Sequence, residues 1–324
     1  MRNYLPSFIL ASLLFVATTG FVSAPTSPLA DYSTIDRYAR STPDSKARDL
    51  TSLAKYLTAP ARSDLAKARV IYAWIVSHIR YDEASFGSGT YGSEVDYAAR
   101  ALQSRRTVCT GFALLYKHML RQVGIDAVTV KGYSRTDDAT AGQPTGPIDH
   151  EWNAVKIDGD WYLVDPTWAV TTAKPGQVND HYFLTDPQAF VAQHLPADPR
   201  WQLLPSPISK ATFDRFPKLY ESYFELGFDT RFPQNGLIRT GDVATITFRN
   251  EADMKIICSS ARTGYTSTNP IPSTLRREGD LYTLTVRVPQ RGNSTLFIFA
   301  KPRQTANEPY IGYKAIGSFT VVRG

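Results

Sequence analysis

The chain has 324 residues, of which 43% are hydrophobic and 20% are charged, so its composition is that of a folded globular protein and excludes a disordered one. This length fits about two domains of ordinary size. The net charge of +6 comes from scattered Lys and Arg residues with no basic stripe between aromatic residues, so the sequence does not predict nucleic-acid binding.

Residues 1–24 are typical of an export signal peptide. They contain one positive charge at Arg2, an apolar core from Phe8 to Ala17, and small residues after it. The apolar core is shorter than the roughly 20 residues that a membrane span needs. We therefore expect a secreted or cell-envelope protein, periplasmic or extracellular, with no membrane span after signal removal. The cleavage site stays open, as does retention of the segment as an uncleaved anchor.

Helical patterns dominate the sequence that follows. Residues 50–57 carry apolar side chains at positions i, i+3, i+4 and i+7. Ser63 and Asp64 offer an N-cap and an acidic first turn to the next helix. A further helical stretch over 97–103 leads to Cys109. This part of the chain is predicted to be a set of amphipathic helices.

Cys109 begins another predicted helix. His118 lies among polar residues and is expected at the surface, and Gly124 ends the helix as a C-cap. The expected buried face consists of Phe112, Leu115, Tyr116, Met119 and Val123. The helix should therefore pack through this face, with Cys109 at its N-terminus.

A β-hairpin is predicted around Asp158 and Gly159, which form a favoured two-residue turn between two strand-like segments. If these two residues are the whole loop, Ile157 pairs with Asp160. A three-residue loop would shift the pairing and reverse the faces of one strand.

The same hairpin brings His150 and Asp165 to one face. Counting outward from the turn, Trp152 faces Asp165, and His150 lies one pair further along the diagonal. A diagonal neighbour is within reach of long side chains. The two residues are either an imidazole held by a carboxylate or ordinary polar residues at strand ends.

The last third of the chain changes character. After a helical stretch over 187–194, short alternating segments separated by turns run through residues 214–324, which is typical of an antiparallel β-sandwich. The link before them is short and rich in aromatic residues, which predicts docked domains with a buried aromatic contact. The sandwich carries no cluster of chemically active residues, so we expect it to position a substrate or a cell-surface partner.

The two cysteines, Cys109 and Cys258, are expected to be unpaired because they belong to different domains. The histidines show no metal-ligand spacing, so neither a metal nor another cofactor is predicted. Cys258 lies in a strand and is interpreted as a core residue. Cys109 is either an apolar filler or a nucleophile, since the unpaired N–H groups and dipole of a helix N-terminus activate a thiol.

Three segments carry a resemblance to a known family: "KARVIYAWIVSHIRYD", "RTVCTGFALLYKHMLRQVGIDAVTVKGY" and "DHEWNAVKIDGDWYLVDPTW". Over residues 29–207 the chain resembles the transglutaminase-like superfamily of cysteine acyl-transfer enzymes. The block "NDHYFLTDPQAFVAQHLPADPRWQLL" and the sandwich behind it look closest to the kyphoscoliosis-peptidase branch. The resemblance implies an α+β transglutaminase/papain-like core, followed by an all-β immunoglobulin-like sandwich.

The resemblance also implies roles for three residues: Cys109 as the nucleophile, His150 as the base and Asp165 as the orienting acid. Glu151 departs from the family, which usually has alanine there. Gln103, six positions before the cysteine, stands where related enzymes have an oxyanion-hole residue. Trp152 and Trp168 either wall an acyl tunnel or pack in the core, and those alternatives remain open.

The expected activity is that of an exported cysteine peptidase, amidase or protein-glutamine acyltransferase. It would act through a thioester on peptide or glutamine carboxamide bonds, with hydrolysis favoured over cross-linking. A protein or peptide of the cell wall or cell surface is the expected substrate. The alternative is a non-catalytic binding or scaffold protein on a transglutaminase-like fold.

Overall fold

The structure is a computed structural model that describes residues 31–324, except 86–91, 263–268, 289–290 and 305–310. The predicted signal peptide, residues 1–24, lies outside the described residues. Within them, no helix combines the length and the apolar character needed to cross a membrane. Tyr32–Gly324 clusters as one unit, so contacts among its segments are described together.

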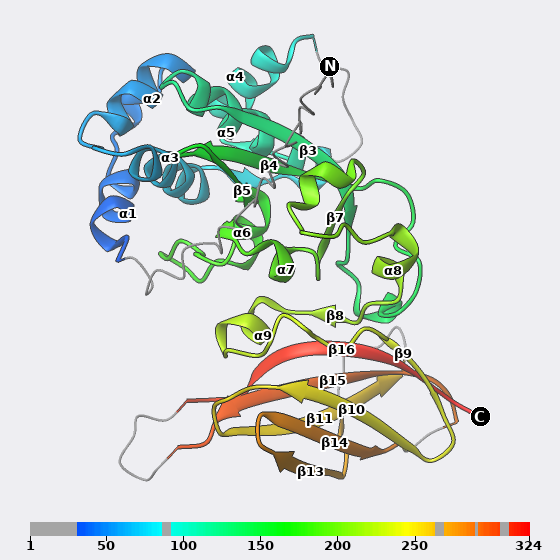
Figure 1. Ribbon diagram of the computed structural model, residues 1–324. Coiled ribbons are helices and arrows are strands. Elements are labelled where there is room, and N and C mark those ends of the chain that lie inside the picture. Colours follow the sequence, from blue (N-terminus) through cyan, green and yellow to red (C-terminus); the bar gives the residue numbers. More distant parts are fainter. Residues whose placement is uncertain (1–30, 86–91, 263–268, 289–290, 305–310) are drawn as a thin grey trace, which may run out of the picture. The chain divides into compact units, whose positions relative to one another are not determined.

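The first part of this unit is mainly helical (Figure 1). Its elements are α1 (Ser33–Arg40), η1 (Asp44–Lys46), α2 (Leu50–Thr58), α3 (Asp64–His78), β1 (Arg80–Tyr81), η2 (Glu83–Ser85), α4 (Glu94–Ser104), β2 (Arg106–Thr107) and α5 (Cys109–Arg121). The predicted N-cap is confirmed, because the Ser63 side-chain oxygen accepts a hydrogen bond from the Ala66 backbone N–H at 3.2 Å. The short strands β1 and β2 pair in parallel beside these helices.

Helix α5 is buried around most of its circumference. The predicted apolar face is confirmed at Phe112 and Leu115, which have no exposed surface. The prediction that His118 lies at the surface is wrong: it is buried, and its Nε2 lies 3.6 Å from the Glu94 carboxylate. Glu94 belongs to α4, which packs along this side of α5. The Glu94 carboxylate also accepts a hydrogen bond from Lys117. Polar residues of α5 are therefore covered by a neighbouring helix rather than by water.

An antiparallel sheet of five strands packs against α5 (Figure 1). Its spatial order is β6-β5-β4-β3-β7, formed by β3 (Ala127–Ser134), β4 (His150–Ile157), β5 (Asp160–Val164), β6 (Phe183–Thr185) and β7 (His194–Pro196). The short helix η3 (Asp138–Thr140) lies between β3 and β4 in the chain. Asn153 of β4 fixes the helix to the sheet, since its side-chain amide donates to the Ala113 carbonyl oxygen at 2.9 Å.

The β4–β5 hairpin has the predicted two-residue turn. Asp158 and Gly159 have positive φ angles of 52° and 97°, as a type I′ turn requires, and Ile157 pairs with Asp160. The predicted facing of Trp152 and Asp165 does not form. Strand β5 ends at Val164, and Asp165 becomes the N-cap of α6 (Pro166–Thr172). Proline at the next position has no N–H for the ladder, which favours the change from strand to helix.

The stretch predicted as helical over 187–194 is only partly so. Helix α7 (Pro187–Phe190) ends early, and His194 begins strand β7 instead. His194 pairs with Ser134 of β3, at the edge of the sheet. A strand of three residues has too short a pattern to be separated from a helix by periodicity. The 3-10 helix η4 (Pro199–Gln202) follows.

The second half of the unit is a β-sandwich of immunoglobulin-like type (Figure 1). One sheet contains β10 (Val243–Arg249), β14 (Leu281–Arg287) and β13 (Ser273–Glu278). The other contains β12 (Asn269–Pro270), β11 (Met254–Arg262), β15 (Gly292–Pro302), β16 (Lys314–Arg323), β8 (Lys218–Leu219) and β9 (Leu237–Thr240). Strand β10 alternates exposed and buried residues as expected, with Ala244, Ile246 and Phe248 facing the core.

One hydrophobic cluster includes an aromatic residue of the link and residues of both halves, which agrees with the predicted docking. The link contains α8 (Lys210–Asp214) and α9 (Glu221–Glu225), with β8 between them. Phe216 belongs to one hydrophobic cluster with Leu195 of β7 and Phe319 of β16. The backbone also approaches closely here: a Cβ at Gly142, which has φ +73°, would lie 2.0 Å from the Leu237 nitrogen. The sandwich is therefore docked on the first half through packed surfaces.

Candidate active site

Cys109 is the first residue of α5, directly after the N-cap Val108. Its side chain is buried, with 6% of the residue exposed. At this position the first N–H groups of the helix have no intrahelical acceptor and lie at the positive end of the helix dipole. Gly111 in the same turn leaves room for the Thr107 side chain, because a Cβ there would lie 1.8 Å from the Thr107 hydroxyl oxygen. The sequence Thr-Gly after the cysteine thus fits a tightly packed helix start.

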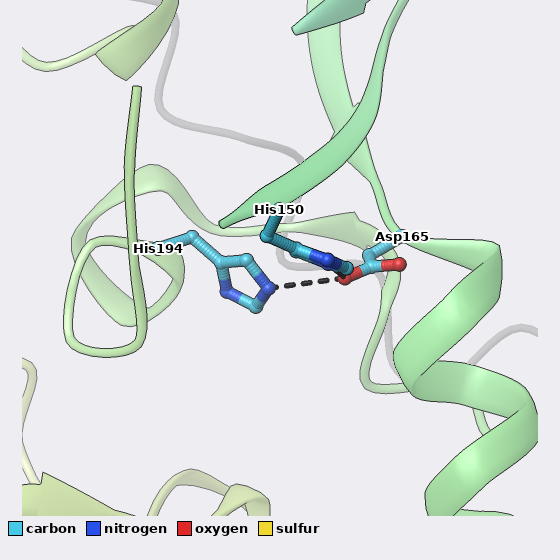
Figure 2. A group of neighbouring side chains, drawn as sticks. All are labelled: His150, Asp165 and His194. Atoms are coloured by element: carbon cyan, nitrogen blue, oxygen red, sulfur yellow. Dashed lines mark hydrogen bonds and ion pairs between the residues drawn. The ribbon is translucent and has the colours of Figure 1, made fainter. Parts of the chain in front are cut away.

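His150 lies against the carboxylate of Asp165 (Figure 2). Nε2 of His150 lies 2.7 Å from Oδ2 of Asp165. The Cys109 side chain lies near enough to the imidazole to help raise its pKa. Since Nε2 is occupied by Asp165, Nδ1 is the nitrogen left for the thiol. The structure therefore brings together the three residues that the sequence singled out as candidates, from α5, β4 and the start of α6.

The charge state of His150 follows from these contacts. Burial alone lowers the pKa of the imidazole, but the charge and hydrogen bond of Asp165, with a smaller part from Cys109, raise its pKa to about 10. The ring is thus an imidazolium at neutral pH, with a proton on each nitrogen. It donates one hydrogen bond to the carboxylate and keeps the other proton on the side of the thiol.

Asp165 is fully buried and accepts four hydrogen bonds. Oδ1 accepts from the backbone N–H groups of Thr167 at 2.8 Å and Trp168 at 3.1 Å, as an N-cap does. Oδ2 accepts from His150 and, at 3.0 Å, from Nε2 of His194. Burial raises the pKa of Asp165, but the charge of His150 and these hydrogen bonds outweigh it and hold the pKa well below its usual range. The carboxylate therefore stays ionised in an apolar surrounding.

His194 is the site residue that the sequence analysis missed (Figure 2). It has no exposed surface and points from β7 toward the same carboxylate oxygen as His150. Its strand pairs with β3, far away in the sequence, so no local spacing relates it to Asp165. The sequence offers only a weak chemical signal for it: a histidine after Gln193, directly before Leu195 and a proline.

The same three residues form the potential metal-ligand group of the described chain. The ligand atoms of His150, Asp165 and His194 lie within 4.8 Å of one another, although the sequence shows no metal-ligand spacing. Two histidines and one carboxylate are a common ligand set. Here both Nε2 atoms lie at hydrogen-bond distance from a single oxygen, and an imidazolium at His150 has no free lone pair for a metal. The residues present fit a hydrogen-bonded relay better than a metal site.

A cavity of about 770 Å³ opens beside His150. His150 and Trp168 line it on the side of the first half, and Lys218, Glu221, Glu225 and Lys314 line it from β8, α9 and β16. Cys109 does not line the cavity, but it lies beside His150, which does line it. A substrate in this cavity would therefore meet side chains from the core and the sandwich at once.

The remaining candidates divide by environment. Gln103 is exposed on α4 and does not line the cavity, which weighs against an oxyanion-hole role. Trp168 lines the cavity, whereas Trp152 is fully buried in a cluster with Phe190. Glu151 is buried, and its carboxylate accepts a hydrogen bond from the Thr110 hydroxyl at 3.0 Å. The departure from the usual alanine is thus accommodated by a partner next to Cys109.

Comparison with known proteins identifies both halves of the chain. Residues 51–166 match the model of the transglutaminase-like superfamily, and residues 210–323 match that of the KY-like immunoglobulin-like domain. Kyphoscoliosis peptidase of Mus musculus is 35% identical over 78% of this chain and 38% of its own length. The Homo sapiens protein of that name is 32% identical over 84% of this chain and 41% of its own. Hillarin of Drosophila melanogaster is 26% identical over 68% of this chain and 29% of its own. The chain thus spans about two fifths of the length of the first two relatives.

Proposed function

The chain belongs to the transglutaminase-like superfamily, and from that premise we propose that it is a cysteine-nucleophile acyl-transfer enzyme with Cys109, His150 and Asp165 as its catalytic residues. One observation carries the proposal. A cysteine at a helix N-terminus shares a buried imidazole with an ionised carboxylate, which is the arrangement that nucleophilic acyl transfer requires.

The reaction follows from the geometry. Cys109 attacks the carbonyl carbon of a peptide or glutamine carboxamide bond as a thiolate, and the imidazolium of His150 beside it already carries the proton that the leaving group needs. Backbone N–H groups at the start of α5 stabilise the oxyanion that forms. His150 then donates a proton to the departing amine or ammonia as the C–N bond breaks, which leaves a thioester on Cys109.

The thioester is resolved by a second nucleophile. Water attacks its carbonyl carbon, gives a proton to the now neutral His150, and releases a carboxylic acid and the Cys109 thiolate. A second amine in place of water would form a new amide and cross-link two chains. We propose hydrolysis as the main outcome, since the cavity beside His150 is open to solvent.

The substrate we propose is a protein or peptide of the cell wall or cell surface, met after export. Export is inferred from residues 1–24, which are typical of a signal peptide. A protein or peptide substrate is inferred from the large cavity, one wall of which comes from the sandwich. The sandwich would then position the substrate without taking part in the chemistry.

A screen of the full chain tests this function. Ammonia release and peptide cleavage are measured on cell-wall peptides and on glutamine-containing proteins, beside Cys109→Ala and Cys258→Ala. Turnover that is lost in C109A and kept in C258A supports the proposal, since Cys258 lies in the sandwich core. Turnover that survives in C109A contradicts it.

A non-catalytic binding protein on the same fold is the second candidate. The buried position of Cys109 would suit it, since the cysteine does not line the cavity. Cys258 offers an internal reference, because burial raises the pKa of its thiol and should keep it unreactive. In a scaffold both cysteines should react slowly with iodoacetamide at neutral pH, whereas in an enzyme Cys109 should react much faster than Cys258.

A further inference from the structure

We propose that His194 is a positioning residue that holds Asp165 in place for His150, so that the site works as a relay of four residues. The inference deepens the proposed function and rests on it. Nothing in the matched motif around Cys109 and His150 points to this residue, because it arrives from strand β7 at the opposite edge of the sheet.

The first support is the shared acceptor. Nε2 of His150 and Nε2 of His194 lie 2.7 and 3.0 Å from the same oxygen of Asp165 (Figure 2). The other oxygen of Asp165 is held by two backbone N–H groups at the start of α6. Without His194, the oxygen that faces His150 would keep a single donor, and the carboxylate could turn about its bond to the chain.

The second support is the protonation state of His194. Burial lowers the pKa of its imidazole further than the contacts with Asp165 raise it, so the ring is neutral at neutral pH. A neutral imidazole that faces an ionised carboxylate carries its proton on the near nitrogen, which is Nε2. Among the described residues Nδ1 of His194 has no hydrogen-bond partner, as expected for the bare nitrogen. The two histidines therefore differ in role: His150 is charged and moves a proton, whereas His194 is a fixed neutral donor.

The third support is the packing that fixes the ring. Its centroid lies 4.2 Å from that of Phe190, in a stacked arrangement, and 4.3 Å from that of Trp168. The centroid of the Trp152 ring lies 5.2 Å from that of His194, in a T-shaped arrangement. A ring held on three sides by aromatic groups has one orientation available, which is what a positioning residue needs.

Other titratable groups surround this pair and must be considered in any pH measurement. Those that interact with Asp165 or His194 are Tyr72 of α3, Tyr81 of β1, Asp149 beside β4, His150, and His181 and Tyr182 before β6. Burial raises the pKa of each tyrosine among them and lowers that of His181 to about 4, so neither the tyrosines nor His181 change charge between pH 5 and 9.

The experiment compares three variants of the full chain. His194→Phe keeps the stacking on Phe190 but removes the donor. His194→Gln is the conservative variant, because the Gln amide nitrogen is as many bonds from Cβ as Nε2 of histidine and can still donate to Asp165. His194→Asn places its amide at the position of Nδ1, where it cannot reach the carboxylate, and it replaces H194F if that variant does not fold.

The first readout is the rate at which iodoacetamide alkylates Cys109, followed by mass spectrometry from pH 4 to 10. We expect H194F to lower the rate at pH 7 by about tenfold, as loss of an orienting partner does elsewhere. The acidic limb of the pH–rate profile of H194F should also move to higher pH, because Asp165 loses a donor that stabilises its ionised form. H194Q should restore the rate to within about threefold. A folded H194F with the wild-type rate and acidic limb would overturn the proposal.

The second readout is independent of cysteine chemistry. Proton NMR of ring N–H groups reports the His150 and His194 protons that are bonded to Asp165. If His194 positions the carboxylate, H194F loses its own signal and also shifts or broadens that of His150, whereas H194Q leaves the latter in place. An unchanged His150 signal in H194F rejects the positioning role. A wild-type Cys109 as slow as Cys258, with the NMR result as expected, rejects the enzymatic function and leaves the positioning role standing.

Discussion

The guanidinium of Arg135 donates a hydrogen bond to the carbonyl oxygen of Phe213 across 2.8 Å, and both residues are fully buried. Arg135 follows strand β3, and Phe213 lies in α8 of the link. The same guanidinium donates to the carbonyl oxygens of Thr140 at 2.9 Å and Asp214 at 3.1 Å. Burial lowers the pKa of Arg135 to about 10, with the charge of Asp214 acting in the opposite direction. One buried cation thus satisfies carbonyl groups from the core and from the link to the sandwich.

Replacing this cation by methionine should destabilise the whole unit. Arg135→Met fills a similar volume but leaves several buried carbonyl groups without a donor, each of which costs about 1–3 kcal/mol. We expect the free energy of unfolding to fall by about 3–5 kcal/mol in a urea titration.

The matched control is Arg231→Met. Arg231 pairs with Asp229 and has a side chain that is 74% exposed, so its loss should leave the free energy of unfolding nearly unchanged. Equal effects of the two substitutions would show that Arg135 does not tie the link to the core.

The contact of His150 with Asp165 predicts a pH dependence of stability with two limbs. The pKa of His150 is raised in the folded state, so its contribution is complete below the ordinary imidazole range and is lost as pH rises toward about 10. The pKa of Asp165 is lowered, so its contribution is present above the ordinary carboxyl range and is lost as pH falls toward the folded-state value. Stability should therefore be greatest between about pH 5 and 6, above the ordinary carboxyl range and below the ordinary imidazole range.

Chemical unfolding from pH 3 to 10 checks both limbs. In Asp165→Asn, which cannot ionise, the acidic decline should flatten, and the alkaline decline should shift to lower pH because His150 loses its counter-charge. Asp186→Asn is a suitable control, since Asp186 is likewise an N-cap with a proline after it but is not part of the site. A D165N profile with the same shape as that of D186N would show that this pair does not set the pH dependence.

Much of the site could be predicted because the positions of Cys109, His150 and Asp165 depend on short-range sequence patterns. The turn at Asp158 and Gly159 fixes the register of two adjacent strands, and with it the approach of His150 to Asp165. Cys109 was placed at a helix start by the helical pattern that follows it. These inferences depend on turn chemistry and periodicity, which a single sequence displays directly.

The missed features depend on tertiary contacts. His118 was expected at the surface because its neighbours are polar, but α4 covers it with Glu94. His194 was assigned to a helical stretch, whereas pairing with Ser134 makes it a strand residue and brings it to Asp165. The expected pairing of Trp152 and Asp165 failed because the strand ends one residue earlier. Each case was decided by a neighbouring element that the local pattern does not show.

The relay also predicts how the site responds to chelation. Because both Nε2 atoms donate to Asp165, removal of metal ions should leave the site unchanged. We expect dialysis against EDTA to change the rate of Cys109 alkylation by less than about twofold, whereas excess Zn²⁺ should slow it by competing for His150 and the thiol. A rate that falls after chelation and returns with a stoichiometric metal would show instead that His150, Asp165 and His194 are metal ligands.

The ion pair of Lys314 with Glu225 predicts that the sandwich contributes to substrate binding and not to chemistry. Lys314 of β16 and Glu225 of α9 lie 2.9 Å apart, and both line the cavity beside His150. Their side chains are 39% and 41% exposed, so the pair should add less than about 1 kcal/mol to stability.

Lys314→Ala should raise KM for a large substrate such as denatured casein severalfold, with kcat for a short glutamine peptide nearly unchanged. Alkylation of Cys109 by iodoacetamide should stay at the wild-type rate, because the reagent is too small to need this wall. Arg276→Ala is the control, since Arg276 forms a more exposed ion pair with Glu278 on β13 and does not line the cavity. If K314A and R276A behave alike on casein, the sandwich wall does not contact substrate. If K314A slows alkylation as strongly as casein turnover, its effect runs through the catalytic residues and the division of labour between the two halves is wrong.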